Sequence, residues 1–570
     1  MKTNKIICLL TALAVLLAAL GLPAFAGEET DVSTLYKAKD VTDTWDDSEA
    51  VHIDLSDVTD GALTVSQAGD YLLSGSLDGQ IVVEAPKDAK VRLILNGVTV
   101  TSASGPAVYE KQADKLIVTL AEGSVNTLTA GSPVTDGDDT VGAALYAEDD
   151  LSLNGKGALY AVSGEKHGIQ SKADLIIANG FIQVQAGGDG IRGRNSVLVL
   201  DGSITVIAGG DGIAATRDDK DGKGWVLIAG GSLSITTGSG AGEVRPSANS
   251  QMGRGGWNGR NSYAGASSDS GVSQKGIKAA TDLTVQGGTL TLDCADDGLH
   301  AVNVTVSGGT LSILSGDDGI HADELALVSG GTVNIAQSYE GIEGKDVSVS
   351  GGYITVVSSD DAVNASGGSD GSGFAGGWGQ RGGFGAGDGT LAISGGELYV
   401  SAGGDGLDSN GSILITGGVT GVWAVTNGGE GTIDFTGTGS ITGGTLIVAS
   451  TQGSMFDSGT LSGQAMMYIT LPSAQAAGSE VAVSDADGNV LASFTPKGTF
   501  NTLTVSCASL SAGDQMSVTA AGQTVYSGQM TDNYASSAGG WGNPGGFGGQ
   551  GGWGNPGGFG SQGGRGGRGR

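Results

Sequence analysis

The sequence predicts an all-β chain wound as a right-handed parallel β-helix, with three short strands in each coil of 21 to 22 residues. Three observations lead to this fold class. Glycine supplies 107 of the 570 residues, two short motifs return at a fixed step, and no repeated segment has the 3.6-residue spacing of a helix. Only 9 prolines occur and no Gly-X-Y period is present, which excludes a collagen-like chain.

The repeat contains two motifs and a third short run. The first motif is an acidic residue, a glycine and a branched aliphatic residue, as in 318–320, and from Gly276 it recurs after 22, 21, 22 and 21 residues. The second is Gly-Gly followed by alternating aliphatic residues, as in 308–313, and a short alternating run precedes it. The blades of a β-propeller need roughly 40 to 50 residues, so this step favours a β-helix. Its right hand follows from the general preference of parallel crossovers.

Two longer steps indicate insertions within the repeat, and further segments precede and follow it. The step is 64 residues between Gly212 and Gly276 and 44 between Ala362 and Gly406. We expect Gly-rich loops there. The predicted parts are a signal peptide (1–26), an N-terminal cap with the first coils (27–140), the parallel β-helix (141–461, with insertions at about 238–271 and 366–389), a C-terminal β cap (462–532) and a disordered Gly/Trp/Arg-rich tail (533–570).

The N-terminus has the features of a secretory signal peptide. Lys2 and Lys5 precede an apolar run, Ile6 to Leu20, and a small-x-small cleavage site follows at 24–26. The run is shorter than the roughly 20 residues needed to span a bilayer, and no other long apolar run follows. The sequence therefore predicts an extracellular protein, secreted or associated with the cell surface, with no transmembrane segment.

The chain is strongly acidic. Its 28 Lys and Arg residues against 60 Asp and Glu residues give a net charge of −32, which argues against a nucleic-acid partner despite the Arg-Gly-Gly end of the tail. Cys294 and Cys507 lack the spacing of a disulfide framework or a metal site, so we predict two buried thiols.

The acidic position of the first motif predicts a metal site. In stacked coils these carboxylates lie about 4.8 Å apart, where two of them repel by roughly 3 kcal/mol at an effective dielectric of about 20. Calcium prefers oxygen ligands and can be shared between adjacent coils, and several acids are doubled. Two alternatives remain open: Asp before Gly caps its own turn, or the acids form a solvated edge. The predicted metal ligands are Asp189, Asp211, Asp296, Asp297, Asp317, Asp318, Asp323, Glu340, Asp360, Asp361 and Asp405.

A second row of polar residues follows the same step. His300 and His321 come directly after Gly-Leu and Gly-Ile, and Lys278 holds the same place one coil earlier. Two stacked imidazoles alone make an incomplete transition-metal site. We predict that the three residues face a ligand, with a plain solvent-facing row as the alternative.

These motifs resemble a known family. Trp45-Asp46-Asp47 followed by 53–56, the run at 91–98 and Asp-Asp-Gly-Ile-His-Ala-Asp at 317–323 are similar to the secreted β-helical carbohydrate-binding domain family, over roughly residues 45 to 530. Its typified member is a cell-surface protein that binds cellulose and acidic plant polysaccharide such as polygalacturonate. The resemblance implies a right-handed parallel β-helix similar to family nine polysaccharide lyases, with calcium along one face. It implies these ligands: Asp296, Asp297, Asp317, Asp318 and Asp323.

The related lyases use a lysine beside calcium as a base. Lys278 and Lys345 are the nearest candidates in this chain, and no lyase-specific motif surrounds either of them. We therefore expect a binding protein rather than an enzyme, in which Ca²⁺ bridges the protein's carboxylates to those of an acidic plant or cell-wall polysaccharide. Two alternatives are a calcium-dependent polysaccharide lyase and a structural adhesin whose Gly-rich tail contacts the cell envelope.

Overall fold

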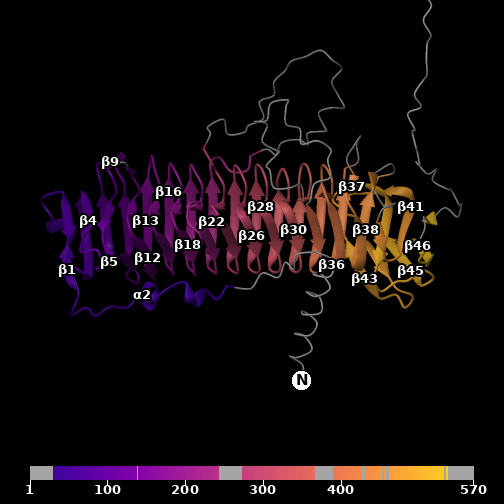
Figure 1. Cartoon of the computed structure of the whole chain (residues 1–570), viewed down its shortest axis with the longest axis horizontal. Coiled ribbons are helices and arrows are strands. Elements are labelled where there is room, and N and C mark those ends of the chain that lie inside the picture. The colour runs from indigo at the N-terminus through magenta and orange to yellow at the C-terminus, as the bar shows by residue number, and fades with distance from the viewer. Residues whose placement is uncertain are drawn as a thin grey trace, which may run out of the picture.

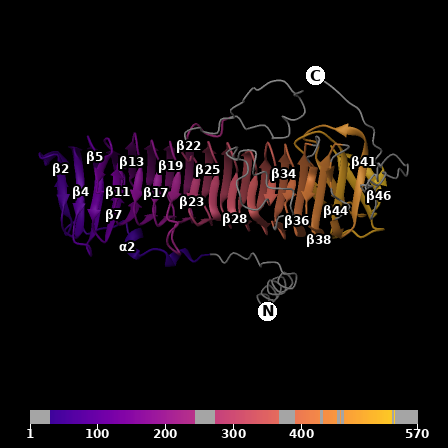
Figure 2. The same ribbon diagram turned by 45° about the horizontal axis from the view of Figure 1, so that its top comes forward.

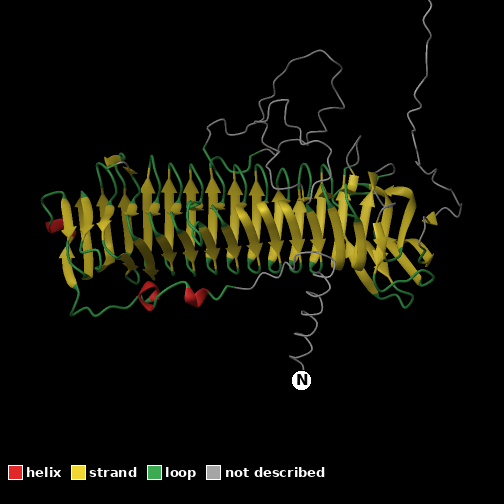
Figure 3. Ribbon diagram, in the orientation of Figure 1, coloured by secondary structure: helices red, strands yellow, loops and turns green. Residues whose placement is uncertain are grey.

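A computed structural model shows an elongated parallel β-helix made almost entirely of strands (Figures 1 and 3). The predicted signal peptide, most of both insertions and nearly all of the tail lie outside the described residues. Within the part of the chain that is described, no helix is long and apolar enough to cross a membrane. The structure describes residues 30–137, 139–242, 272–365, 389–425, 431–451, 455–456, 461–531 and 535–536.

Each coil contributes one strand, or part of one, to each of three parallel faces. The first face follows the acidic motif and consists of β2 (Ala62–Val65), β4 (Gln80–Glu84), β6 (Val108–Gln112), β11 (Leu145–Ala147), β14 (Ile169–Ser171), β17 (Ile191–Gly193), β20 (Ile213–Ala215), β23 (Ile277–Ala279), the starts of β26 (Leu299–Val306), β28 (Ile320–Val328) and β30 (Ile342–Val349), then β32 (Val363–Ala365), β35 (Leu407–Ser409), β37 (Gly431–Phe435) and β39 (Met455–Phe456).

The second face continues from the first after a bend. It consists of β1 (Val51–Asp54), the starts of β3 (Gly69–Asp78) and β5 (Lys90–Thr101), β7 (Lys115–Leu120), β12 (Asp150–Gly155), β15 (Asp174–Ile177), β18 (Ser196–Val199), β21 (Trp225–Ile228), β24 (Asp282–Val285), the ends of β26, β28 and β30, β33 (Thr390–Ile393), the starts of β36 (Ser412–Ala424) and β38 (Gly439–Ser450), and β40 (Leu461–Gly463).

The third face carries the Gly-Gly motif at the start of its strands. It consists of the ends of β3 and β5, β8 (Val125–Thr129), β13 (Ala158–Ser163), β16 (Phe181–Ala186), β19 (Ser203–Ala208), β22 (Ser232–Thr237), β25 (Thr289–Cys294), β27 (Thr310–Ser315), β29 (Thr332–Gln337), β31 (Tyr353–Val357), β34 (Glu397–Ala402) and the ends of β36 and β38. A small hairpin, β9 (Val134–Asp136) and β10 (Asp139–Val141), lies outside the three faces.

The register of the coils follows the sequence step. Ile191 pairs with Ile213, and Ile213 pairs with Ile277, so the 64-residue step closes within one coil. The series continues through Leu299 and Ile320. Equivalent residues of successive motifs therefore stack directly on one another, as the fold prediction requires.

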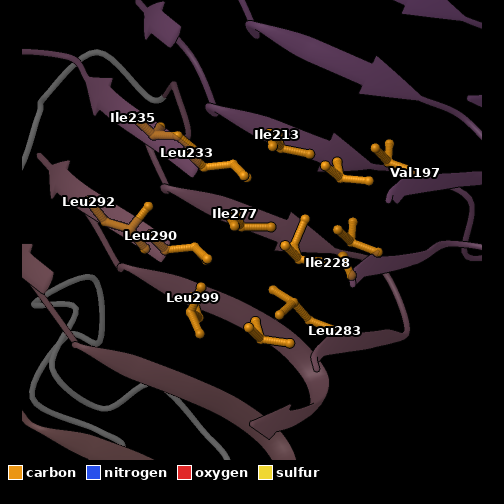
Figure 4. Close-up of a cluster of buried hydrophobic side chains, with 14 of the residues drawn as sticks. Val197, Ile213, Ile228, Leu233, Ile235, Ile277, Leu283, Leu290, Leu292 and Leu299 are labelled. Atoms are coloured by element: carbon orange, nitrogen blue, oxygen red, sulfur yellow. The ribbon is translucent and has the colours of Figure 1, made fainter. Parts of the chain in front are cut away.

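The core consists of aliphatic ladders from all three faces. On β16 exposed and buried residues alternate strictly, which is the pattern of a strand with one side against a core. Ile213, Ile277 and Leu299 of the first face meet Leu290 and Leu283 of the other two in the interior (Figure 4). Each such side chain contributes about 1.5–3 kcal/mol through burial. The ladders therefore hold the stacking rigid enough to position the corners.

Glycine serves two separate purposes at those corners. A Cβ on Gly298, in the acidic motif, would lie 2.6 Å from the Gly319 carbonyl oxygen of the next coil. Gly309, the second glycine of a Gly-Gly motif, has φ +83°, a conformation that side chains disfavour. The first position has no room for a side chain, and the second requires a positive φ that glycine adopts readily.

An N-terminal strap, residues 30–45, runs along the outside of the second face. It contains η1 (Val32–Thr34) and α2 (Ala38–Val41), and both ribbon views place α2 beside one edge of the coils (Figures 1 and 2). Leu35 packs with a cluster that includes Leu198 and Leu227. The strap then leads to β1 and η2 (Leu55–Asp57). It therefore covers an outward-facing apolar stripe of the second face.

The C-terminal end is covered by antiparallel strands. β44 (Phe500–Cys507) pairs with β38 and with β41 (Met466–Gln475), and β47 (Ala535–Ser536) adds to β41. A separate sheet has the order β43 (Val490–Phe494), β42 (Val481–Ser484), β45 (Gln515–Ala520) and β46 (Gln523–Gln529). These strands have a core of their own. Cys294 and Cys507 are both buried and unbridged, as predicted.

Candidate metal and ligand site

An acidic row runs along the corner between the third and first faces. Its members immediately precede the small residue at the entry to each first-face strand, and the paired strands stack them coil upon coil. Lys275 takes the equivalent place in one coil and interrupts the row. The acidic row consists of Asp189, Asp211, Asp297, Asp318, Glu340, Asp361 and Asp405.

Carboxylates of the row bind the main chain of the next coil. Asp297 Oδ1 accepts the Asp318 amide at 3.1 Å, and Asp361 Oδ1 accepts the Asp405 amide at 2.6 Å. Asp297 is only 3% exposed. These aspartates therefore connect neighbouring coils instead of capping their own turns, and Asp297 belongs to no solvated edge.

A second row lies three residues further along each coil. Its members are in register through the first-face strands, and it includes the three residues predicted to face a ligand. Its character changes along the axis from basic to acidic. Ala214 interrupts the second row, which consists of Arg192, Lys278, His300, His321, Glu343, Asn364, Asp408 and Asp434.

In the N-terminal half of the site, basic side chains lie beside the acidic row. Arg192 lies 2.9 Å from Asp189 Oδ2, and Lys278 Nζ lies 4.0 Å from Asp211 Oδ2. Lys275 contacts Asp297. Burial alone would raise the pKa of Asp297, but Lys275 and a hydrogen bond with His300 hold it well below its usual value.

Lys275 also reaches the doubled acid before Asp297. Its Nζ lies 3.2 Å from Asp296 Oδ2 and contacts Asp297 Oδ2 as well. Burial opposes the charge of Lys275, but the two carboxylates raise its pKa. The cation is therefore a fixed part of this coil.

His321 is the centre of a buried cluster. Its Nδ1 lies 2.8 Å from Asp318 Oδ2 and 2.9 Å from Glu343 Oε2, and its ring stacks on His300 at 4.8 Å between centroids. Burial lowers its pKa, yet the bonds to the two carboxylates outweigh burial and raise it to about 11. Asp323 is 3.6 Å from Nε2 and half exposed, at the margin of the cluster.

Acidic residues occupy both rows in the C-terminal half of the site. Burial raises the pKa of Glu340, and Glu343 and Asp318 raise it further. Burial and the neighbouring carboxylates of Asp408 and Asp405 likewise raise the pKa of Asp361. This part of the corner therefore crowds buried carboxyl groups whose simultaneous ionisation is unfavourable.

The donor atoms divide the possible metal sites into two kinds. The clusters Asp297–His300–His321 and Asp318–His321–Glu343 contain imidazole nitrogen, which suits transition metals. The clusters Asp296–Asp297–Asp317 and Asp405–Asp408–Asp434 offer oxygen alone, which suits calcium. In each cluster the ligand atoms lie within 4.8 Å of one another. Because Lys275 already contacts Asp296 and Asp297, the chemistry of calcium fits the Asp405–Asp408–Asp434 cluster better.

The structure brings most of the predicted residues together but adds others. Glu343, Asp408 and Asp434 complete clusters with predicted ligands, and Lys275 enters the acidic row. The sequence could have indicated these residues, because they recur with the same spacing as the acidic motif. Lys345 pairs instead with Glu324 of the neighbouring coil, at 3.3 Å.

A family model and a curated relative share one description. A family model described as carbohydrate-binding domain-containing protein matches residues 59–319 and 302–383, which together make up more than half of the chain. A carbohydrate-binding domain-containing protein of Acetivibrio thermocellus is 32% identical over 145 residues, 25% of this chain and 51% of the relative. The chain thus spans about half the length of that curated relative. A solved gadolinium derivative of the polysaccharide lyase-like protein from C. thermocellum has 24% identity and a TM-score of 0.34, covering 47% of this chain and 94% of that one.

Proposed function

We propose that this chain, which belongs to the carbohydrate-binding domain-containing protein family, is an exported protein that binds an acidic polysaccharide through calcium. The observation that carries the proposal is the all-oxygen cluster of Asp405, Asp408 and Asp434 at the acidic end of the two rows. Calcium bound there would balance the charge of these carboxylates and would offer its open coordination positions to a sugar carboxylate.

The net charge supports a bridging cation. A chain of net charge −32 repels a polyuronate such as polygalacturonate at long range, and a bound divalent ion reverses the sign of the local field. Asp408 and Asp434 are both half-buried. Asp405 lies deeper and also accepts the Gly431 amide.

Retention on polygalacturonate with calcium and with a chelator tests the proposal. We expect the chelator to abolish retention. Asp408→Asn and Asp434→Asn should each weaken calcium affinity, measured by calorimetry, by about tenfold or more, since each removes one charged ligand. Asp201→Asn, on an exposed turn between the second and third faces, is the matched control. Retention that is unchanged by the chelator would contradict the calcium bridge.

The same mixture tests the lyase alternative. Lys278 Nζ lies beside the acidic row, 3.2 Å from Ser273 Oγ, and its side chain is 34% exposed. A base at this place would remove the proton beside the uronate carboxyl group, and the elimination that follows would give an unsaturated product that absorbs ultraviolet light. We expect no such absorbance to develop, and its appearance in wild type but not in Lys278→Gln would favour the lyase.

A further inference from the structure

A groove lies on the third face where the C-terminal strands meet the β-helix. Tyr353 of β31 and Tyr399 of β34 point outward on neighbouring coils, with ring centroids 5.7 Å apart. The ring of Phe494, at the end of β43, stacks on Tyr399 at 6.0 Å and 5° between planes. Phe494 is only 4% exposed and supports Tyr399 from below, whereas Tyr353 is the most exposed of the three rings.

The hollow beside these rings has a volume of about 680 Å³. Asn334 and Thr355 line it from the third face, and Thr495 and Lys497 line it from the C-terminal strands. The hollow is therefore a cleft between two walls, one from the coils and one from the strands that cover their end.

The second wall is held in place by close packing. A Cβ on Gly421 would lie 2.5 Å from the Phe494 ring and 2.9 Å from Tyr399, so glycine at this position permits the stacking. Trp423 Nε1 donates a hydrogen bond to the Thr499 carbonyl at 3.2 Å. The aromatic surface is thus formed before any ligand arrives, which reduces the entropic cost of binding.

The groove combines an exposed ring with polar groups. Tyr353 is 46% exposed, and Tyr399 donates its hydroxyl to Glu397 at 2.9 Å. Within the described chain, no carboxylate lies within ion-pair distance of Lys497 Nζ, so this exposed ammonium keeps its donors. Flat apolar rings surrounded by hydroxyl, amide and ammonium groups suit a pyranose ring, which has apolar C–H faces and a polar rim.

We propose that this groove, which we call the tyrosine groove (Tyr353, Tyr399, Phe494 and Lys497), is a separate sugar-binding site that stacks a neutral pyranoside chain without calcium. One side chain of each charge lines it, Glu397 and Lys497, in contrast to the acidic row. The inference rests on the proposed carbohydrate binding but uses other residues and another class of glycan.

Calorimetric titrations with neutral hexasaccharides test the inference. Cellohexaose, xylohexaose and mannohexaose are each added to the full chain in the presence of a chelator, and we expect at least one to bind. Tyr353→Ala should weaken that binding by about tenfold or more, because it removes the exposed stacking ring. Tyr353→Phe, which keeps the ring, should stay within about threefold of wild type.

The matched control is Tyr160→Ala. Tyr160 is 39% exposed on β13 of the same third face, many coils away from the C-terminal strands, and it does not line the tyrosine groove. Absence of binding by all three probes, or an equal effect of the two alanine variants, overturns the inference. Calcium-dependent retention on polygalacturonate is measured in parallel, so failure of the tyrosine groove and failure of the calcium site give different results.

Discussion

Replacing Asp40 by alanine should release the N-terminal strap from the β-helix. The Asp40 side chain is 1% exposed, and its Oδ1 accepts from Lys115 Nζ and from Ser152 Oγ, each at 2.7 Å. Among the described residues, the substitution leaves the Lys115 ammonium, 13% exposed, with Asp150 at 4.0 Å as its remaining ion-pair partner. Loss of one partner from a buried pair costs about 3–5 kcal/mol, and the remaining contact with Asp150 places this case near the lower limit. At about 1.4 kcal/mol per decade, local opening of the strap rises roughly a hundredfold.

Hydrogen exchange of the amides in the strap measures this opening directly, and it needs no two-state assumption for a repeat fold. Asp43→Ala is the control, because its contact with Lys156 is long, at 3.9 Å, and the Lys156 side chain is 62% exposed, so the pair contributes little. If both variants change protection of the strap equally, the reasoning about burial is refuted.

The acid dependence of the strap follows from the same contacts. Burial alone would raise the pKa of Asp40, but the hydrogen bonds from Lys115 and from the Lys37 amide outweigh it and lower the pKa. A lowered pKa means that the contribution of ionised Asp40 is complete above the unfolded value of about 4 and is lost as the pH falls through the folded value. Protection of the strap should therefore be constant from about pH 5 to 8 and decrease below about pH 4.

Two further predictions concern the coils. Gly298→Ala places a methyl group 2.6 Å from the Gly319 carbonyl oxygen, so it should lower the free energy of unfolding by about 1–3 kcal/mol. An unchanged urea midpoint would show that the coils separate easily. Burial raises the pKa of the Cys294 thiol to about 12, so it should resist alkylation at pH 8 until the protein is unfolded. Rapid labelling of Cys294 in the native protein, followed by mass spectrometry, would contradict its burial.

The fold was predictable because every coil of a β-helix places the same kinds of residue at equivalent positions. Each coil must place an aliphatic residue above the previous one, so Ile213, Ile277 and Leu299 reveal their pairing through the step alone, even across a 64-residue interval. Glycine at the corner indicates the same stacking, because the Gly319 carbonyl oxygen of the next coil leaves no room for a side chain at Gly298. The fold class is confirmed for these physical reasons.

The charges of the site were harder to predict, because neutralisation depends on contacts between coils. Lys275 lies 22 residues before Asp297 and contacts it, and Glu343 reaches His321 from the next coil. The motif places every acidic residue at an equivalent position, but the charge beside each one depends on its neighbour in the second row. The tyrosine groove had no sequence signal, since the packing of Phe494 against Tyr399 depends on how the C-terminal strands cover the coils.

A row of equivalent aspartates does not imply a uniform line of calcium ions. Two carboxylates about 4.8 Å apart repel by a few kcal/mol at an effective dielectric of about 20, and any nearby cation relieves that repulsion. In the N-terminal coils the protein supplies that cation itself, as at Asp189 with Arg192. An ion added there would have to displace a bound side chain, whereas the second-row neighbours of Asp408 among the described residues are Asn364 and Asp434, neither of them basic. The calcium proposal therefore applies to the C-terminal coils. Asp405 lies three residues beyond β34, which also carries Tyr399, so the same coil contributes to both proposed sites, each for its own class of glycan.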